Sequence, residues 1–134
     1  MKTTPYLFFG GKCEEAVAFY HEALGAEVRA LVRFADLPGA NAETQDRVMH
    51  AELGFDDGTI FASDGQGDGR QGTGFAISLE ARDDDEAERL FAILAAEGTI
   101  GVPLMTTPFA SRFGMATDRF GTPWMITTPQ APLA

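Results

Sequence analysis

The sequence is poor in the residues that build disulfides, metal sites and cationic surfaces. It has one cysteine and two histidines in 134 residues, and 20 acidic against 10 basic side chains give a net charge of −10. One cysteine cannot form an internal disulfide, which fits a reducing compartment. The acidic surface repels phosphate backbones and anionic lipids, so we expect no nucleic-acid partner and no membrane partner.

Long apolar runs are also missing. Near the N-terminus only four apolar residues follow one another, from Tyr6 to Phe9. Such a run is too short for the core of a signal peptide or for a membrane-spanning helix. We therefore expect a cytoplasmic protein. Hydrophobic residues make up 45% of the chain, which is enough for the core of a single domain over residues 1–134.

One structural pattern occurs twice along the chain. Gly58 to Phe61 aligns with Gly121 to Trp124 at an offset of 63 residues, and each segment lies in a predicted hairpin. The repeat predicts module one at about residues 1–64 and module two at about 75–130. Residues 65–74 between them are rich in glycine and are expected to form a connector.

Each module contains one predicted helix. The first spans Cys13 to Leu24 and ends at Gly25, and the second spans Asp83 to Glu97 and ends at Gly98. Asp83 with Glu86 has the spacing of a capping box. Strands surround both helices, so the sequence predicts an α+β fold of two β-α-β-β-β modules. We expect two sheets rich in antiparallel pairs, each with its helix on the convex side.

His50 and Glu52 are the best polar candidates for a functional site. They stand two residues apart in a predicted strand, so both side chains face the same side of the sheet. They could bind a ligand, transfer a proton or supply part of an unusual metal site. The alternative is a structural pair at the surface or in a dimer contact.

The remaining candidates are aromatic residues. On the concave side of a curved sheet, between the modules, their rings could line an apolar pocket; otherwise they belong to the core or to a subunit interface. These candidates are Phe75, Phe109, Phe113 and Trp124. Arg112 is the cation nearest to them in sequence and could pair with an acidic ligand group, with a plain surface role as the alternative.

Several other motifs favour structural roles. Residues 67–72 match G-x-G-x-x-G, but a strand follows them where a phosphate site needs a helix. Cys13 stands at a predicted helix start beside Lys12, a setting that can lower a thiol pKa, yet packing is the preferred interpretation. The acidic run 83–86 is a helix start with a solvated face rather than a catalytic carboxylate pair.

Three groups of segments keep a characteristic order and spacing. They are Pro5 to Phe9 with Cys13 to Tyr20, Val48 to Leu53 with Ser63 and Asp64, and Arg112 to Ile126. In these the chain resembles the vicinal oxygen chelate (glyoxalase and bleomycin-resistance) superfamily. The match is to its PhnB-like branch, labelled "3-demethylubiquinone-9 3-methyltransferase". The resemblance implies cupped half-barrel sheets, usually in homodimers, and the glycine-rich connector makes exchange of modules between subunits plausible.

The same resemblance implies where a metal would bind. Enzymes of the superfamily hold a divalent ion with His and Glu ligands on strands of each module. Carried over to this sequence, those positions fall on Pro5, Ala62, Phe75 and Met125, none of which can ligate a hard cation. We therefore expect neither a metal nor a cofactor. The methyltransferase label finds no strand–glycine loop–helix signature for S-adenosylmethionine in the sequence.

Three functions remain open from the sequence. The first is a metal-free module that binds a small, partly apolar or aromatic molecule in the cupped cavity. The second is a lyase or isomerase that uses His50 and Glu52, with or without a metal. The third is a homodimer whose concave faces pack together and which has no small-molecule role.

Overall fold

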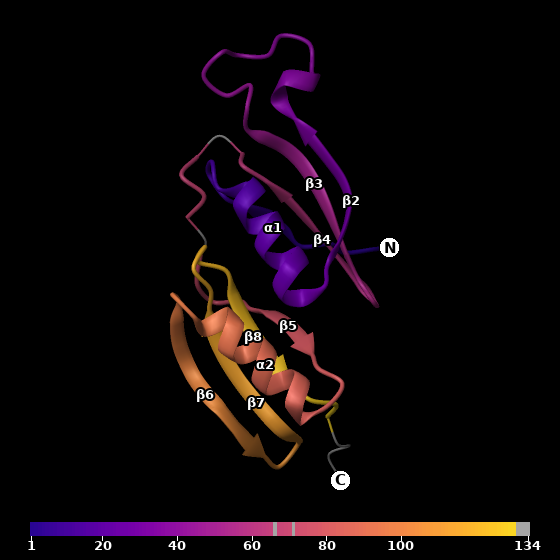
Figure 1. Ribbon diagram of the computed structural model, residues 1–134, viewed down its shortest axis with the longest axis vertical. Coiled ribbons are helices and arrows are strands. Elements are labelled where there is room, and N and C mark those ends of the chain that lie inside the picture. Colours follow the sequence, from indigo (N-terminus) through magenta and orange to yellow (C-terminus); the bar gives the residue numbers. More distant parts are fainter. Residues whose placement is uncertain (66, 71, 131–134) are drawn as a thin grey trace. The chain divides into compact units, whose positions relative to one another are not determined.

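The computed structural model describes residues 1–65, 67–70 and 72–130. It divides into two compact units, Met1–Gln71 and Gly72–Ala134. Each unit contains a four-stranded sheet with one α-helix against it (Figure 1). Within the described residues, no helix has the length and apolar character needed to cross a membrane.

The first unit follows the predicted strand–helix–three-strand order. Its sheet has the strand order β1-β4-β3-β2, with β1 parallel to β4 and the other neighbours antiparallel. A 3-10 turn, η1, follows β2. The elements are β1 (Tyr6–Phe8), α1 (Cys13–Leu24), β2 (Glu27–Arg33), η1 (Phe34–Asp36), β3 (Val48–Phe55) and β4 (Gly58–Ser63).

The second unit repeats this arrangement. Its sheet has the order β5-β8-β7-β6, again with one parallel pair, β5 with β8. The elements are β5 (Ile77–Glu80), α2 (Asp84–Ala95), β6 (Thr99–Thr107), β7 (Ala110–Thr117) and β8 (Pro123–Thr127). Two mixed sheets with one helix each confirm the predicted α+β fold and its duplicated β-α-β-β-β pattern.

Helix α1 has the predicted bounds, whereas α2 differs in its caps. Asp83 caps α2 as expected, because its carboxylate accepts the N–H of Glu86 at 2.9 Å. The predicted capping box is wrong in its second half. The Glu86 carboxylate accepts the backbone N–H of Arg82, one residue before the cap, at 3.1 Å.

The C-terminal end of α2 also differs from the prediction. The helix stops at Ala95, and the residue with left-handed backbone is Glu97, at φ 62°, rather than Gly98. Gly98 is required for a different reason. A Cβ on Gly98 would lie 2.1 Å from the carbonyl oxygen of Thr117, so β6 can start beside β7 only without a side chain there.

The two units align one residue away from the register that the sequence repeat predicts. Ile60 and Trp124 both face the helix of their unit, whereas the sequence aligned Trp124 with Phe61, on the opposite face. The cause is the loop before the last strand. Phe55 pairs with Gly58 across a two-residue turn, but Thr117 pairs with Pro123 across a longer loop.

Asp64, directly after β4, ties the first unit together. Its side chain is 2% exposed. Oδ1 accepts the N–H groups of Gly11 at 2.7 Å and Cys13 at 2.8 Å, and Oδ2 accepts the N–H of Val48 at 2.8 Å. One carboxylate therefore joins the start of α1, the start of β3 and the end of β4. Its negative charge also lies at the positive N-terminus of α1.

The chain after Asp64 packs back onto the first unit. Gly10 and Gly69 both have left-handed backbone, at φ 57° and 72°. A Cβ on Gly10 would lie 2.2 Å from the carbonyl carbon of Asp68, and a Cβ on Gly69 would lie 2.2 Å from that of Phe9. The middle glycine of the G-x-G-x-x-G sequence thus serves a backbone crossing, so its role is structural, as the sequence favoured.

Replacing Asp64 by asparagine should destabilise the first unit by about 3 kcal/mol, because it removes charge-assisted hydrogen bonds and turns an amide N–H₂ toward backbone donors. Urea unfolding followed by amide signals of the first unit measures the change. Asp68→Asn is the control, since its exposed carboxylate accepts the N–H of Arg70 and makes a weak ion pair with the Arg70 guanidinium at 3.9 Å, and it should stay within about 0.5 kcal/mol of wild type. Equal stability of the two variants would contradict this role of Asp64.

Candidate functional site

The sheet of the first unit has one face against α1 and one face that the helix does not cover. The side chains that face α1 are buried and apolar: Leu7, Ala51, Leu53, Ile60 and Ala62. The alternate side chains point the other way. We call this second surface the open face, and it consists of Tyr6, Phe8, His50, Glu52 and Phe61.

The register of three strands brings these residues together. Tyr6 on β1 pairs with Phe61 on β4, which pairs with Glu52 on β3. The predicted common orientation of His50 and Glu52 is consistent with this register, because both alternate with the buried Ala51 and Leu53. Parallel pairing of β1 with β4 therefore places N-terminal aromatic residues beside the polar residues of β3.

The aromatic rings of the open face contact one another. Tyr6 and Phe8 stack with centroids 4.8 Å apart, and the edge contact between Tyr6 and Phe61 has a centroid distance of 5.8 Å. The ring centroids of His50 and Phe61 lie 4.9 Å apart, and His50 Nδ1 lies 2.9 Å from the Tyr6 hydroxyl oxygen. Tyr6 and Phe8 nevertheless remain 40% and 49% exposed, so the cluster presents ring surface to the outside.

Tyr6 keeps its proton under ordinary conditions. Partial burial raises the pKa of the Tyr6 phenol, against a smaller lowering by the nearby Ser63 hydroxyl. The phenol therefore reaches His50 as a neutral O–H group rather than as a phenolate.

Glu52 has a cationic neighbour on β2. Arg29 is the extra residue of an irregularity in the pairing of β2 with β3, between Val28 and Ala30. Its guanidinium crosses Gly54, where a Cβ would lie 2.3 Å from Arg29 Cζ, and approaches the Glu52 carboxylate to 3.9 Å. At that distance, and partly exposed, the ion pair is weak, so both groups can exchange partners.

The other predicted site residues belong to the second unit. Phe113 lies on β7 with Phe109 just before that strand, and their ring centroids are 5.4 Å apart in an edge contact. Phe75 precedes β5 instead of forming part of it, and it is 46% exposed. The structure thus brings together His50 with Glu52, and Phe109 with Phe113.

Trp124 is the candidate that the structure moves away from any open surface. Its side chain is 0% exposed, and its Nε1–H donates to Asp118 Oδ2 at 2.8 Å. Asp118 also accepts the N–H groups of Phe120 and Thr122, which fixes the turn between β7 and β8. Trp124 is a core residue of the second unit, so its predicted place in a binding wall is wrong.

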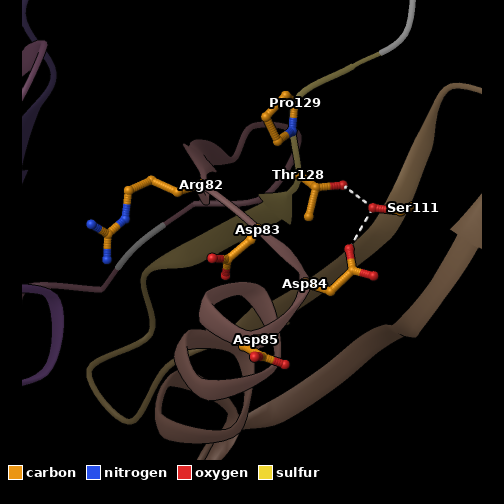
Figure 2. A pocket seen from close by; sticks show the side chains of 7 residues that line it. All are labelled: Arg82, Asp83, Asp84, Asp85, Ser111, Thr128 and Pro129. Carbon is orange, nitrogen blue, oxygen red and sulfur yellow. Dashed lines mark hydrogen bonds between the residues drawn. The ribbon is translucent and has the colours of Figure 1, made fainter.

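A shallow pocket of about 380 Å³ opens at the N-terminus of α2 (Figure 2). Its lining is Arg82, Asp83, Asp84, Asp85, Ser111, Thr128 and Pro129. The polar groups there bond to each other: the Ser111 hydroxyl donates to Asp84 and lies 3.0 Å from the Thr128 hydroxyl. These contacts join α2 to the ends of β7 and β8, which makes the pocket part of the scaffold.

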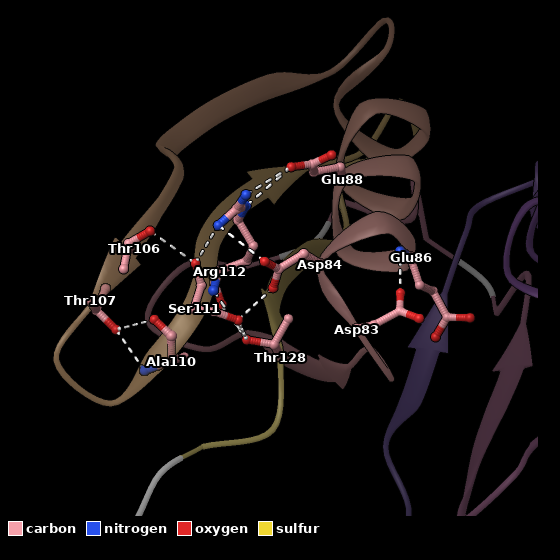
Figure 3. A network of polar contacts seen from close by, with 10 residues as sticks. All are labelled: Asp83, Asp84, Glu86, Glu88, Thr106, Thr107, Ala110, Ser111, Arg112 and Thr128. Atoms are coloured by element: carbon pink, nitrogen blue, oxygen red, sulfur yellow. Dashed lines mark hydrogen bonds and ion pairs between the residues drawn. The ribbon is translucent and has the colours of Figure 1, made fainter.

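Arg112 belongs to the same polar network (Figure 3). Its guanidinium lies 3.1 Å from Glu88 and 3.4 Å from Asp84, both on α2. Of the two roles considered for Arg112, ligand contact and surface residue, its position in the structure fits the surface role, because Asp84 and Glu88 already pair with it.

Sequence reasoning did not propose Tyr6 or Arg29 as site residues. Tyr6 could have been found from the sequence, because it has a hydroxyl-bearing ring in an apolar strand and stands two residues from Phe8, on the same face. Arg29 carried none, because its orientation depends on the irregular pairing of β2 and on the missing side chain of Gly54.

Comparison with known proteins shows the family of this chain. A family model described as 3-demethylubiquinone-9 3-methyltransferase matches residues 1–127. The chain belongs to this family. Its relatives include Protein YjdN of Escherichia coli (strain K12), which is 33% identical over 138 residues and matched over 94% of each chain.

Solved structures show the same relationship for this PhnB-like protein. Protein PA1353 from Pseudomonas aeruginosa is 39% identical with a TM-score of 0.87, covering 98% of this chain and 99% of that one. A putative 3-demethylubiquinone-9 3-methyltransferase, PhnB protein, from Bacillus cereus is 26% identical with a TM-score of 0.78, covering 96% and 99%. A glyoxalase-related enzyme from Fulvimarina pelagi, 17% identical with a TM-score of 0.62, shows the glyoxalase fold.

The residues of this PhnB-like chain do not fit the divalent metal of the glyoxalase superfamily. Ala62 is buried against α1, and the positions carried over offer no nitrogen or oxygen side chain. Within residues 1–65, 67–70 and 72–130, no three His, Cys, Asp or Glu side chains are grouped to hold an ion. His50 with Glu52 alone is a smaller donor set than protein zinc sites use.

The family name also points to S-adenosylmethionine, and the fold does not fit the usual site for it. A doubly wound site needs a parallel sheet with a glycine loop leading into a helix at the end of a strand. Here each sheet is mixed, with a single parallel pair. The glycines that follow β1, at positions 10 and 11, meet the Asp64 carboxylate and the residue 68–69 backbone instead of an open cradle.

Cys13 should be inert in the folded protein. It is fully buried, and burial with the nearby Asp64 charge raises the pKa of its thiol from 9.0 to about 12. Iodoacetamide at mildly alkaline pH should leave Cys13 unmodified in native protein and alkylate it after unfolding in urea, as mass spectrometry can show.

The same shift predicts a loss of stability in alkali. The unfolded thiol releases its proton above pH 9.0, whereas the folded thiol keeps its proton up to a pH of about 12. The free energy of unfolding is therefore unaffected by this thiol below pH 9.0 and falls as the pH rises from 9.0 to about 12. Cys13→Ala should remove this part of the pH dependence of urea unfolding. Rapid native alkylation, or identical alkaline slopes for wild type and variant, would contradict the assignment.

Proposed function

We propose that this PhnB-like protein binds a small, partly apolar or aromatic molecule on the open face of its first sheet, without a metal. The observation that carries the proposal is the exposed ring surface of Tyr6 and Phe8 next to the polar pair His50 and Glu52. Ligand sites in proteins combine an apolar surface with a few placed polar groups in this way. The fold that carries this proposed site is that of the glyoxalase and bleomycin-resistance type.

The rings supply attraction and the polar groups supply direction. An aromatic ligand stacked on this cluster would gain about 0.5–1.5 kcal/mol per ring contact beyond the area it buries. His50 offers a ring nitrogen beside Phe61, and Glu52 with Arg29 offers opposite charges at the edge of the same face. These groups fix which way round an asymmetric ligand lies.

The second unit has an apolar surface of its own. Phe109 and Phe113 lie near Met105, which pairs with Phe113 across β6 and β7 and is itself exposed. We propose these residues, together with the exposed Phe75, as further contacts for an apolar ligand or for a second subunit of a homodimer. Measuring the oligomeric state distinguishes the two possibilities, because a second subunit covers the rings only in a dimer.

A lyase or isomerase remains the second candidate. The observation in its favour is that Tyr6, His50 and Glu52, three groups able to exchange protons, share the open face. The third candidate is a homodimer, with or without exchanged units, in which partner surfaces cover the exposed rings and no small molecule binds. Methyl transfer, the activity in the family's name, is not what we propose, since the fold lacks the usual cofactor cradle.

Titration with soluble aromatic metabolites should shift amide signals of β1, β3 and β4 and leave those of α1 unchanged. Phe61→Leu should weaken the binding by about tenfold, the loss expected from one aromatic contact, whereas Phe19→Leu on α1 should leave it unchanged. Two-dimensional NMR gives both the site and the affinity. Light scattering of the same samples reports whether a dimer is present.

The outcomes separate the three candidates. Shifts confined to the open face with sensitivity to Phe61→Leu support the binding protein. Turnover of the bound compound that His50→Gln abolishes would favour the lyase or isomerase. A dimer whose open-face signals do not respond to any aromatic compound would favour the homodimer without a ligand, and would overturn the proposal.

A further inference from the structure

The bond between Tyr6 and His50 determines what His50 can offer to a ligand. The phenol oxygen lies 2.9 Å from His50 Nδ1. A neutral imidazole carries one N–H, and the bond made by one nitrogen decides whether the other is a donor or an acceptor. If Tyr6 donates to Nδ1, the proton of His50 is on Nε2.

The surroundings favour Tyr6 as the donor. Partial burial keeps the phenol protonated, so it has an O–H to give. The Ser63 hydroxyl also reaches the phenol, where its hydrogen bond lowers the phenol pKa, as a donor to the phenol oxygen does, and it accepts the N–H of Gly65 at 2.9 Å. A phenol is also a better donor than acceptor, since its oxygen lone pair is delocalised into the ring. His50 Nδ1 is then the acceptor.

We propose that Tyr6 is a positioning residue that holds His50 in the Nε2–H form, so that the open face selects flat aromatic compounds with a carbonyl-type acceptor oxygen. This inference rests on the proposed function, because it requires a ligand on this face. An ionised Glu52 can only accept hydrogen bonds and cannot serve such an oxygen. Arg29 also carries N–H donors, but its guanidinium lies at the edge of the face, against Glu27 and Glu52. Beside the rings His50 supplies the donor, and Tyr6, Phe8 and Phe61 supply the apolar contact.

The second histidine provides an internal reference of the opposite kind. His21 Nδ1 lies 2.7 Å from the carbonyl oxygen of Ala26, and a carbonyl can only accept. His21 must therefore carry its proton on Nδ1. One spectrum of the protein thus contains both imidazole forms, each fixed by a different neighbour.

The first measurement needs no ligand. Imidazole nitrogen–proton correlation spectra are recorded at a pH about 1–2 units above the usual imidazole pKa of about 6.5. We expect His50 to show an unprotonated Nδ1 and a protonated Nε2, and His21 the reverse. Tyr6→Phe keeps the ring and removes the hydroxyl, so His50 should move toward a mixture of both forms while His21 stays unchanged. His50→Gln and His21→Gln assign the signals.

The second measurement uses acetophenone and α-methylstyrene, which have nearly the same shape but differ in the acceptor oxygen. Wild type should bind acetophenone about two- to tenfold more tightly, the range for one net hydrogen bond between neutral groups. Tyr6→Phe should reduce this preference toward equality while its binding of α-methylstyrene changes little.

Each other outcome overturns the inference in a distinguishable way. A protonated Nδ1 on His50 in wild type, or no change in His50 with Tyr6→Phe, refutes the role of Tyr6. The expected imidazole form with equal binding of both probes refutes the selection, while the open-face binding site stands. If neither probe shifts open-face signals, the proposed binding of aromatic molecules there fails, and the selection by His50 fails with it.

Discussion

The buried carboxylate of Asp64 is the constraint on which the first unit depends. Three backbone N–H groups, from Gly11, Cys13 and Val48, converge on its two oxygens. They belong to segments that are far apart in sequence, so a single side chain sets the distance between the start of the helix and the sheet. The open face depends on this arrangement, because Tyr6 on β1 and His50 on β3 can stay in contact only when both strands are fixed against β4.

In the second unit an uncharged residue occupies the position that corresponds to Asp64. Thr128 occupies the position that Asp64 has in the first unit, since each donates its backbone N–H to a carbonyl oxygen of the facing strand, that of Arg112 for Thr128 and that of Val48 for Asp64. The Thr128 hydroxyl accepts the N–H of Arg112, as Asp64 accepts that of Val48. The buried charge of the second unit lies instead at Asp118, in the loop before β8. Duplicated modules have thus kept the fold and moved the polar centre to the other end of the last strand.

The sequence predicted what local patterns control. Helix α1 has its predicted bounds because the apolar stripe and Gly25 act within one element, and His50 with Glu52 share a face because strand alternation is local. The contact of Tyr6 with His50 was not predicted, since it depends on the parallel pairing of β1 with β4 across a long stretch of chain. Trp124 was misplaced because its orientation depends on the loop length before β8, which shifts the strand by one residue. Burial of an aromatic residue is decided by that register and cannot be deduced from its chemistry.

The crossing of Gly10 and Gly69 has a consequence for the order in which the protein is made. Because residues 68–69 complete the packing around Phe9 and Gly10, the chain that leaves β4 is part of the first unit up to this point. On the ribosome, all contacts of that unit become available once this short segment has emerged, before β5 and α2 emerge. The first unit can therefore fold before its homologous neighbour appears, which lowers the chance that strands of one repeat pair with those of the other.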